Sequence, residues 1–233
     1  MDGNKIIFVT GTDTGVGKTV LTALLLHHLR ESGVNALAMK PFCSGGQADV
    51  RLLQSLQRGT LSDDEMNPYY FEKPVAPLVA QKGRQAIRLG EVMEQIRKVS
   101  RGCDCLLIEG SGGLLVPLGP GFMVADLIGG LKCRVIIAAR NRLGTINHTL
   151  LTVSALLEYG VKHDAMSVVL VSQGRKDLSS RTNRRVLADL LKTVPVLEIP
   201  FLGARISGRA EILRSSRKLG KILKKLAAKS GPI

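Results

Sequence analysis

The sequence predicts an α/β fold of three layers, in which helices flank a mostly parallel central sheet. Hydrophobic runs rich in β-branched residues alternate with helical stretches along the chain, which is typical of a sheet buried on both faces. The chain has 233 residues, of which 45% are hydrophobic and 22% are charged. This composition suits a large buried core, and no long linker divides the chain, so we expect a single domain spanning residues 1–233.

The alternation of hydrophobic runs and helical stretches predicts where the individual strands and helices lie. Strands are expected at residues 5–10, 35–40, 105–109, 134–139, 167–172 and 195–199. Helices are expected at residues 17–31, 48–57, 89–99, 124–129, 146–159, 180–191 and 209–227. Residues 20–26 are apolar almost throughout, as in a helix packed against a central sheet. The proline-containing segment 60–83 predicts an irregular loop over the edge of the sheet, and such loops often belong to a site.

Positive charge is concentrated at the C-terminus. The formal net charge is +14, and residues 205–229 hold nine Lys and Arg against Glu211 alone, which predicts a basic helix at about residues 205–229. Aromatic residues make up 3% of the chain and none follows residue 205. We therefore favour a solvated face over contact with nucleic acid or a membrane, although this charge would still attract an acidic partner.

The N-terminal residues and the cysteines indicate the cellular compartment of the protein. No apolar run approaches the roughly 20 residues that cross a bilayer, and the N-terminus passes into a strand without a signal peptide, so we expect a cytoplasmic protein. Cys43, Cys103, Cys105 and Cys133 lack the paired spacing of a zinc site, which favours reduced, buried thiols. Cys43 lies in a glycine-rich loop and is either inert or a reactive thiol.

The strongest motif is Gly-Thr-Asp-Thr-Gly-Val-Gly-Lys-Thr at residues 11–19, between the first strand and the first helix. Its glycines let backbone N–H groups close on phosphate oxygens, Lys18 suits the β and γ phosphates, and the Thr19 hydroxyl suits Mg²⁺. The motif predicts a P-loop NTPase fold, with a loop one residue longer than usual because Thr12 stands where the first glycine belongs. The predicted nucleotide-binding residues are Thr12, Asp13, Thr14, Gly15, Val16, Gly17, Lys18 and Thr19.

Two further strand ends carry polar residues. Lys40 and Ser44 follow the second strand and should lie beside the phosphate loop, because ligands bind at the carboxyl ends of parallel strands. Lys40 suits a phosphate or a carboxylate there, unless it is only a solvated strand end. Glu109 ends an apolar strand before a glycine run that includes Gly112, as the carboxylate that helps hold Mg²⁺ does. Asp49 is either another metal ligand or a partner of a helix dipole.

In combination these motifs resemble the dethiobiotin synthetase family, in order from residue 6 to about residue 202. The motifs that carry the resemblance are residues 11–19, Lys40-Pro41 with Ser44-Gly45, Asn67-Pro68-Tyr69, residues 109–113 with Pro117-Leu118, and Leu143-Gly144-Thr145-Ile146-Asn147-His148. The lengthened phosphate loop is itself a feature of that family. The resemblance implies an ATP-dependent cyclo-ligase that closes the ureido ring of dethiobiotin from 7,8-diaminononanoate and CO₂.

The resemblance also implies roles for particular residues. One amine of the substrate would take up CO₂, the carbamate would attack the γ-phosphate of ATP, and the second amine would displace phosphate. The implied catalytic residues are Lys18, Lys40, Thr14 and Ser44, of which Thr14, Lys40 and Ser44 face the substrate. The implied Mg²⁺ ligands are Thr19, Asp49 and Glu109, and the implied nucleotide contacts include Glu109, Gly112, Gln173 and Pro200.

The family further implies a homodimer with the active site at the interface. Gly144 and Asn147 would contact the diamine of the partner subunit, although Asn147 suits a helix N-cap equally well. Gln173-Gly174 departs from the Asn-Asp pair that commonly reads the base, and Leu78 stands where a Pro-His pair is common. A glutaminase-linked P-loop amidoligase needs a further domain that this length does not accommodate. A P-loop ATPase switch of the positioning or nucleic-acid-binding kind is the remaining alternative.

Overall fold

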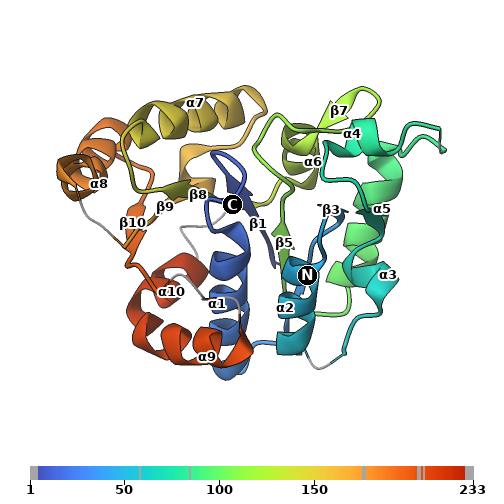
Figure 1. Cartoon of the computed structure of the whole chain (residues 1–233), viewed down its shortest axis with the longest axis horizontal. Coiled ribbons are helices and arrows are strands. Elements are labelled where there is room, and N and C mark those ends of the chain that lie inside the picture. The colour runs from blue at the N-terminus through green and yellow to red at the C-terminus, as the bar shows by residue number, and fades with distance from the viewer. Residues whose placement is uncertain are drawn as a thin grey trace.

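A computed structural model describes residues 5–57, 59–83, 85–174, 177–203, 206 and 208–228. Six of its strands form one sheet in the order β10-β9-β8-β1-β5-β2 (Figure 1). These strands are β1 (Lys5–Gly11), β2 (Ala36–Met39), β5 (Cys105–Glu109), β8 (Arg134–Arg140), β9 (Met166–Val171) and β10 (Val196–Ile199). Every neighbouring pair is parallel, so the predicted fold class is confirmed.

The strand β1 lies at the centre of the sheet, between β5 and β8. Phe8 of β1 pairs with Ile108 on one side and with Val135 on the other. All three side chains are almost completely buried. A strand covered on both faces has no polar side to present, which is why these segments are continuous apolar runs.

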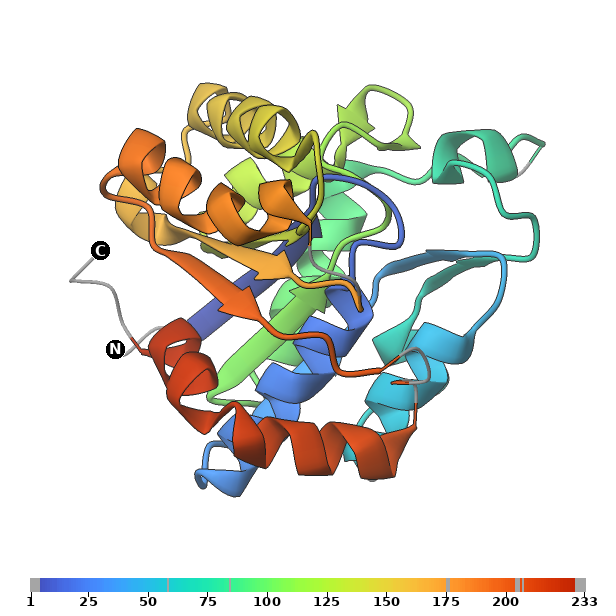
Figure 2. The ribbon, with the colours of Figure 1, turned by 60° about the vertical axis from the view of Figure 1, so that its left-hand side comes forward.

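Helices cover both faces of the sheet, as Figure 2 shows. On one face α1 packs against α2, α9 and α10, and on the other α6 packs against α5 and α7, with α8 beside α7. The helices are α1 (Lys18–Glu31), α2 (Ala48–Gln57), α5 (Leu89–Ser100), α6 (Val124–Leu131), α7 (Thr145–Glu158), α8 (Leu178–Leu191), α9 (Arg209–Lys218) and α10 (Gly220–Ala227). Because the six strands are parallel, their carboxyl ends lie at one edge of the sheet, where folds of this kind bind ligands.

The segment at residues 60–83 is more regular than predicted. It contains α3 (Asp63–Met66), β4 (Tyr69–Phe71) and α4 (Pro77–Ala80), and β4 pairs in parallel with β3 (Phe42–Ser44). Ser62 caps α3 by accepting a hydrogen bond from the backbone N–H of Glu65. The prediction of an irregular loop was wrong because strand pairing between distant segments leaves no local periodicity. The remaining short elements are β6 (Pro117–Gly119), β7 (Phe122–Met123) and the 3₁₀ turn His163–Ala165.

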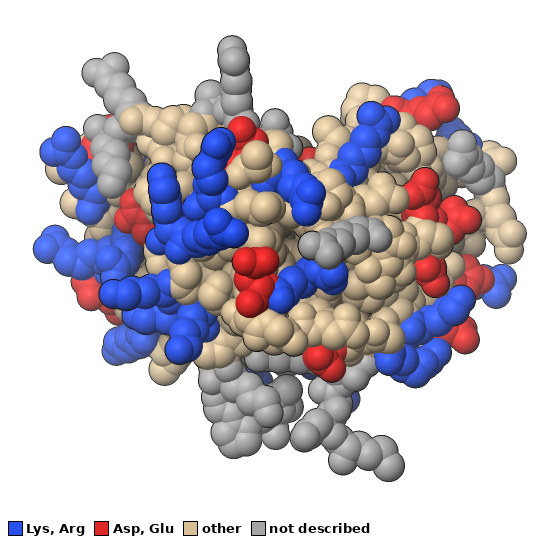
Figure 3. Space-filling view, turned by 90° about the horizontal axis from the view of Figure 1, so that it is seen from below, with Lys and Arg blue, Asp and Glu red and all other residues tan. Residues whose placement is uncertain are grey.

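The C-terminal basic segment forms two helices rather than the single predicted one. Helix α9 ends at Lys218 and α10 begins at Gly220, while residues 205 and 229 lie outside the described part. The Arg134 guanidinium donates to the carbonyl of Leu226 at 2.9 Å and so caps the last turn of α10. Lys and Arg side chains gather on the face that these helices form (Figure 3). No helix in the described ranges is long and apolar enough to span a membrane.

Candidate active site

The phosphate loop connects the end of β1 with the start of α1. Gly15 and Gly17 have φ angles of 67° and 101°, which side-chain-bearing residues rarely adopt. A Cβ atom on Gly17 would also lie 3.3 Å from the side chain of Val171. Gly17 caps α1 without a side-chain hydrogen bond, so the first N–H groups of this helix stay available to an anion.

The remaining loop residues hold the loop against the sheet. The backbone N–H of Thr12 donates to the carbonyl of Ala138 at 3.0 Å, and the N–H of Thr14 donates to Asp13 Oδ1 at 2.6 Å. Val16 is buried, and a Cβ atom on Gly11 would lie 2.7 Å from its Cγ2. The loop is therefore shaped by internal contacts before any ligand binds.

Lys18 is buried at the start of α1. Its Nζ donates to the backbone carbonyl of Asp13 at 2.9 Å, so the side chain folds back over the loop. Burial lowers the pKa of Lys18 to about 8, against the opposing effect of the Glu109 carboxylate. A negatively charged phosphate in the loop would restore the protonated state.

Lys40, Asp49, Glu109 and Thr19 form one cluster beside the loop. Lys40 Nζ donates to Glu109 Oε1 at 2.8 Å and also to Asp49 Oδ2. The Thr19 hydroxyl donates to the same Glu109 oxygen at 2.7 Å. Burial lowers the pKa of Lys40, but the Glu109 and Asp49 carboxylates outweigh it and raise that pKa above its ordinary value. Lys40 is 7% exposed, so the alternative of a solvated strand end is wrong.

The cluster also fits a magnesium ion. Glu109 Oε2 is buried and accepts no hydrogen bond from the described residues. Asp49 provides a second carboxylate and Thr19 a hydroxyl, and Mg²⁺ is usually held by one or two carboxylates together with water and substrate phosphates. The described part of the chain contains no group of three His, Cys, Asp or Glu side chains suited to a metal. The donors therefore match a nucleotide-bound ion better than a fully protein-bound one.

Two predicted site residues, Ser44 and Thr14, carry hydroxyl groups on β3 and in the phosphate loop. Ser44 Oγ, at the end of β3, is buried without a hydrogen-bond partner among the described residues. Thr14 is exposed at the loop, and a Cβ atom on Gly112 would lie 3.6 Å from its Oγ1. Cys43 beside Ser44 is a free, buried thiol whose pKa is raised by burial, which disfavours the reactive alternative.

Four predicted site residues lie apart from the cluster. Gly144 and Asn147 are exposed at the start of α7, and Gly144 rather than Asn147 occupies the N-cap position. The N-cap interpretation of Asn147 was therefore wrong. Gln173 and Pro200 are exposed just beyond β9 and β10, two neighbouring strands whose carboxyl ends share one edge of the sheet.

Sequence reasoning missed two residues at this edge. Arg140 ends β8, and its Nε and Nη2 donate to the carbonyl of Gly15 at 3.2 Å and 2.6 Å. Phe201 is 49% exposed, and a Cβ atom on Gly174 would lie 3.2 Å from its ring. A charged residue at the end of an apolar strand is the signal that identified Lys40 and Glu109, and it would have identified Arg140.

Together, the parallel sheet, the glycine loop and the lysine–carboxylate cluster define a P-loop nucleotide-binding protein. The fold is shared with a chain of the MinC:MinD cell division protein complex of Aquifex aeolicus, at 14% identity and a TM-score of 0.62 over 98% of both chains. A ParA family ATPase of Chlorobium tepidum has the same fold at 14% identity and a TM-score of 0.55, over 97% of this chain and 93% of that one.

Sequence comparison narrows this class. A family model described as an AAA domain matches residues 5–204. The ATP-dependent dethiobiotin synthetase of Bacillus licheniformis is 37% identical over 83% of this chain and 87% of its own length. That of Anaeromyxobacter dehalogenans is 37% identical over 93% of this chain and 96% of its own. The chain belongs to the dethiobiotin synthetase family.

Proposed function

We propose that this protein is an ATP-dependent dethiobiotin synthase, which forms the ureido ring of dethiobiotin from 7,8-diaminononanoate, CO₂ and ATP and releases ADP and phosphate. Family membership supports the reaction. The observation that carries the proposal at the site is the buried Lys40 ammonium, held against Glu109 beside the phosphate loop. A buried cation at this point suits a reaction in which a neutral amine becomes an anionic carbamate.

The reaction needs placement rather than a protein nucleophile. One substrate amine adds to CO₂ and loses a proton, which gives a carbamate. A carbamate oxygen attacks the γ-phosphorus of ATP and expels ADP, and the second amine then attacks the carbonyl carbon of the mixed anhydride and expels phosphate. Holding these reactants in one geometry lowers the barrier because their translational and rotational entropy is lost on binding.

Each charged group of the cluster has a role in this scheme. Lys18 and the loop N–H groups stabilise the charge on the transferring phosphoryl group. Lys40 offsets the negative charge of the carbamate, and Thr14 and Ser44 orient the substrate through their hydroxyl groups. Ser44 Oγ supports this role because it is buried without a hydrogen-bond partner among the described residues, and buried hydroxyl groups usually have one.

Thr19, Asp49 and Glu109 would hold Mg²⁺, which neutralises charge on the β and γ phosphates when it is bound. Glu109 Oε2 supports this assignment because it accepts no hydrogen bond within the described part of the chain. Gly112 lets the backbone approach the nucleotide, and Gln173 and Pro200 contact the base. The half-exposed ring of Phe201 is suited to stack beside them.

The proposed active unit is a homodimer of single-domain subunits in the cytoplasm. Gly144 and Asn147 contact the substrate of the partner subunit. Leu143, just before α7, and Leu151, within it, support such an interface because they are 82% and 61% exposed. Burying large apolar side chains of this kind is a principal driving force of association.

ATP hydrolysis by the purified protein tests this function, measured with and without 7,8-diaminononanoate and bicarbonate and with the product identified by mass. We expect phosphate release that depends on the diamine, together with dethiobiotin. Turnover that ignores the diamine but rises with DNA would instead support a P-loop ATPase switch. Sedimentation of the protein at several concentrations tests the dimer separately.

A further inference from the structure

A second pocket lies at the opposite end of α1 from the phosphate loop. It has a volume of about 430 Å³ and is formed by α1, α2, α9 and the turn that precedes β2. Arg30 lies twelve residues after Lys18, so the two ends of α1 are about 18 Å apart at a rise of about 1.5 Å per residue. The pocket is therefore separate from the proposed active site. Its lining residues are His27, Arg30, Glu31, Gly33, Val34, Asn35, Leu56, Arg209 and Leu213.

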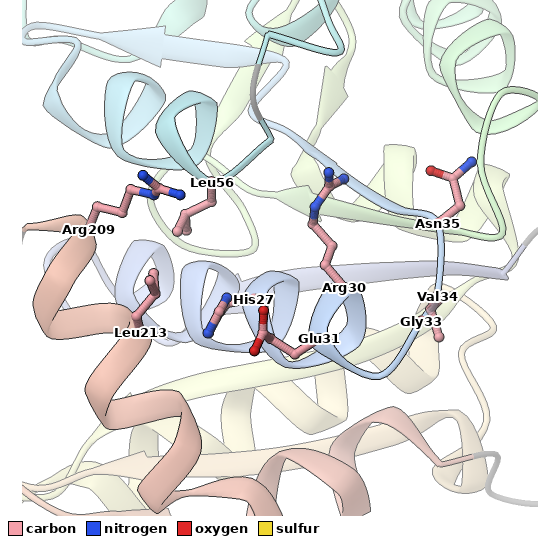
Figure 4. A pocket seen from close by; sticks show the side chains of 9 residues that line it. All are labelled: His27, Arg30, Glu31, Gly33, Val34, Asn35, Leu56, Arg209 and Leu213. Carbon is pink, nitrogen blue, oxygen red and sulfur yellow. The ribbon is translucent and has the colours of Figure 1, made fainter.

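Two arginines approach this pocket from different helices (Figure 4). Arg209 extends from the start of α9 toward Leu56, and Arg30 rises from α1. Arg30 Nη1 donates to the carbonyl of Ala36 at 2.8 Å, which fixes this side chain and leaves its other N–H groups available. Arg209 forms no ion pair with any described residue.

The only carboxylate among the described lining residues is partly neutralised. Glu31 lies 3.9 Å from Arg217 Nη2, on the side of α9. Burial is the largest cause of the lowered pKa of His27; the Glu31 carboxylate opposes it, and Arg217 and Arg209 lower this pKa further. The electrostatic balance around the pocket is therefore positive, and an anion is the ligand that would offset it.

His27 supplies an independent sign of a missing partner. It is 8% exposed, and its Nε2 is buried without a hydrogen-bond partner among the described residues. A buried polar atom without a hydrogen-bond partner is destabilising. His27 lines the pocket, so a bound ligand would lie next to its side chain.

The walls between the charged groups are apolar. Leu56 on α2 and Leu213 on α9 face the same space as Val34. The N-terminus of α9, which starts at Arg209 and has ten residues, adds a positive helix-dipole end at the rim. Guanidinium groups, an N-terminal helix end and an apolar wall suit a small oxyanion that carries a short hydrocarbon chain.

We infer that this pocket, bounded by Arg30, Arg209 and His27, is a binding site for a small carboxylate- or phosphate-bearing anion, distinct from the nucleotide and diamine sites. Either oxyanion would make the same charge-assisted hydrogen bonds to a guanidinium group. The apolar wall favours a carboxylate that carries a hydrocarbon chain over inorganic phosphate. This inference does not depend on the reaction at the phosphate loop.

Calorimetric titration with three probes tests the site: inorganic phosphate, acetate and hexanoate, at constant ionic strength. The protein is saturated with Mg²⁺ and a non-hydrolysable ATP analogue, so that the β and γ phosphate positions of the loop are filled. We expect one site, with hexanoate binding more tightly than acetate if the apolar wall is used and phosphate binding most tightly if only charge matters. The Arg209→Gln variant should weaken the best probe about tenfold or more, since a charged hydrogen bond is lost.

Arg214→Gln is the matched control, because Arg214 lies on the same helix with a 70% exposed side chain and does not line the pocket. It should change the dissociation constant by less than about twofold. Nitrogen-15 NMR of the histidines gives a second readout: the probe should shift the imidazole signals that disappear in His27→Gln. Absence of binding by the analogue-saturated protein, an unchanged affinity in Arg209→Gln, or an equal loss in both arginine variants would overturn the inference.

Discussion

The positively charged side chains near the two ends of α1 differ in whether they have partners within the protein. At the first end Lys18 and Lys40 are buried, and each has a specific partner: the Asp13 carbonyl for Lys18, and the Glu109 and Asp49 carboxylates for Lys40. At the other end Arg209 has no ionic partner among the described residues and lines an open pocket with Arg30. The charged groups of the first end are paired before a ligand arrives, whereas at the second end Arg209 has no ion pair with a described residue.

This difference predicts which substitutions change the stability of the protein and which change only its binding of ligands. Buried charges need partners because an unpaired one costs several kcal/mol, so the lysine–carboxylate cluster must be complete in the folded protein. Half-exposed arginines are stabilised by water and tolerate the absence of a partner. Substitutions at the first end should therefore affect both folding and turnover, and substitutions at the second end should affect binding of an added anion.

The largest expected effect is on turnover in Lys18→Met. We expect kcat to fall about a thousandfold, or about 4 kcal/mol, because the ammonium no longer stabilises the transferring phosphoryl group. Steady-state phosphate release in the presence of the diamine measures it. Lys221→Met, on the exposed surface of α10, is the control and should retain activity. A loss of less than tenfold in Lys18→Met would contradict the assigned role of this residue.

The next largest effect is on stability in Lys40→Met. Removing the ammonium leaves Glu109 buried without its cation, so the free energy of unfolding should fall by about 3 kcal/mol in urea denaturation. The double variant Lys40→Met with Glu109→Gln removes the unpaired charge and should regain part of this loss. Both variants should still bind ADP but should not close the ureido ring. Equal stability of the single variant and the wild type would exclude a paired, buried Lys40.

A third prediction concerns protons at Lys18. Its pKa is lowered to about 8 from the ordinary value of 10.5, so about half of the free protein lacks this proton at pH 8. Nucleotide phosphate should restore the charged form, so ATP binding should take up about half a proton at pH 8. Calorimetry in buffers of different ionisation enthalpy measures this uptake, and Lys18→Met should abolish it.

The same shift fixes the sign of a pH effect on stability. Between pH 8 and 10.5 the unfolded chain binds more protons at Lys18 than the folded protein does. The Lys18 contribution to the free energy of unfolding therefore rises with pH across that window, and this contribution should be absent in Lys18→Met. A contribution that falls with pH would show that Lys18 is instead charged and paired in the free protein.

The smallest expected effect is at Arg140. Its two hydrogen bonds to the Gly15 carbonyl hold the phosphate loop from β8. Arg140→Met should weaken ADP binding about fivefold, or about 1 kcal/mol, because the loop must be ordered on binding. The neighbouring exposed Arg142→Met is the matched control. Equal effects of both substitutions would contradict this role, because Arg140 would then act only through its positive charge.

Most of the fold was accessible from the chain alone. The six central strands and the helices between them follow from periodicity and apolar runs, which are local properties. Strands β3 and β4 were missed because each has three residues and their pairing joins distant segments. The break between α9 and α10 was missed because it is a single residue, Leu219, which is apolar like its neighbours on the buried side of both helices.

The sequence by itself determined the nucleotide loop, because its glycines, lysine and threonine are adjacent in the chain and their chemistry depends on that spacing. It also identified Lys40 and Glu109 as separate strand ends. Only the tertiary structure decided that these two meet at 2.8 Å across 69 residues, and that Arg140 reaches Gly15 across 125. The pocket between α1 and α9 likewise depends on packing, because long-range contacts are set by how the layers assemble and leave no periodic signal in the chain.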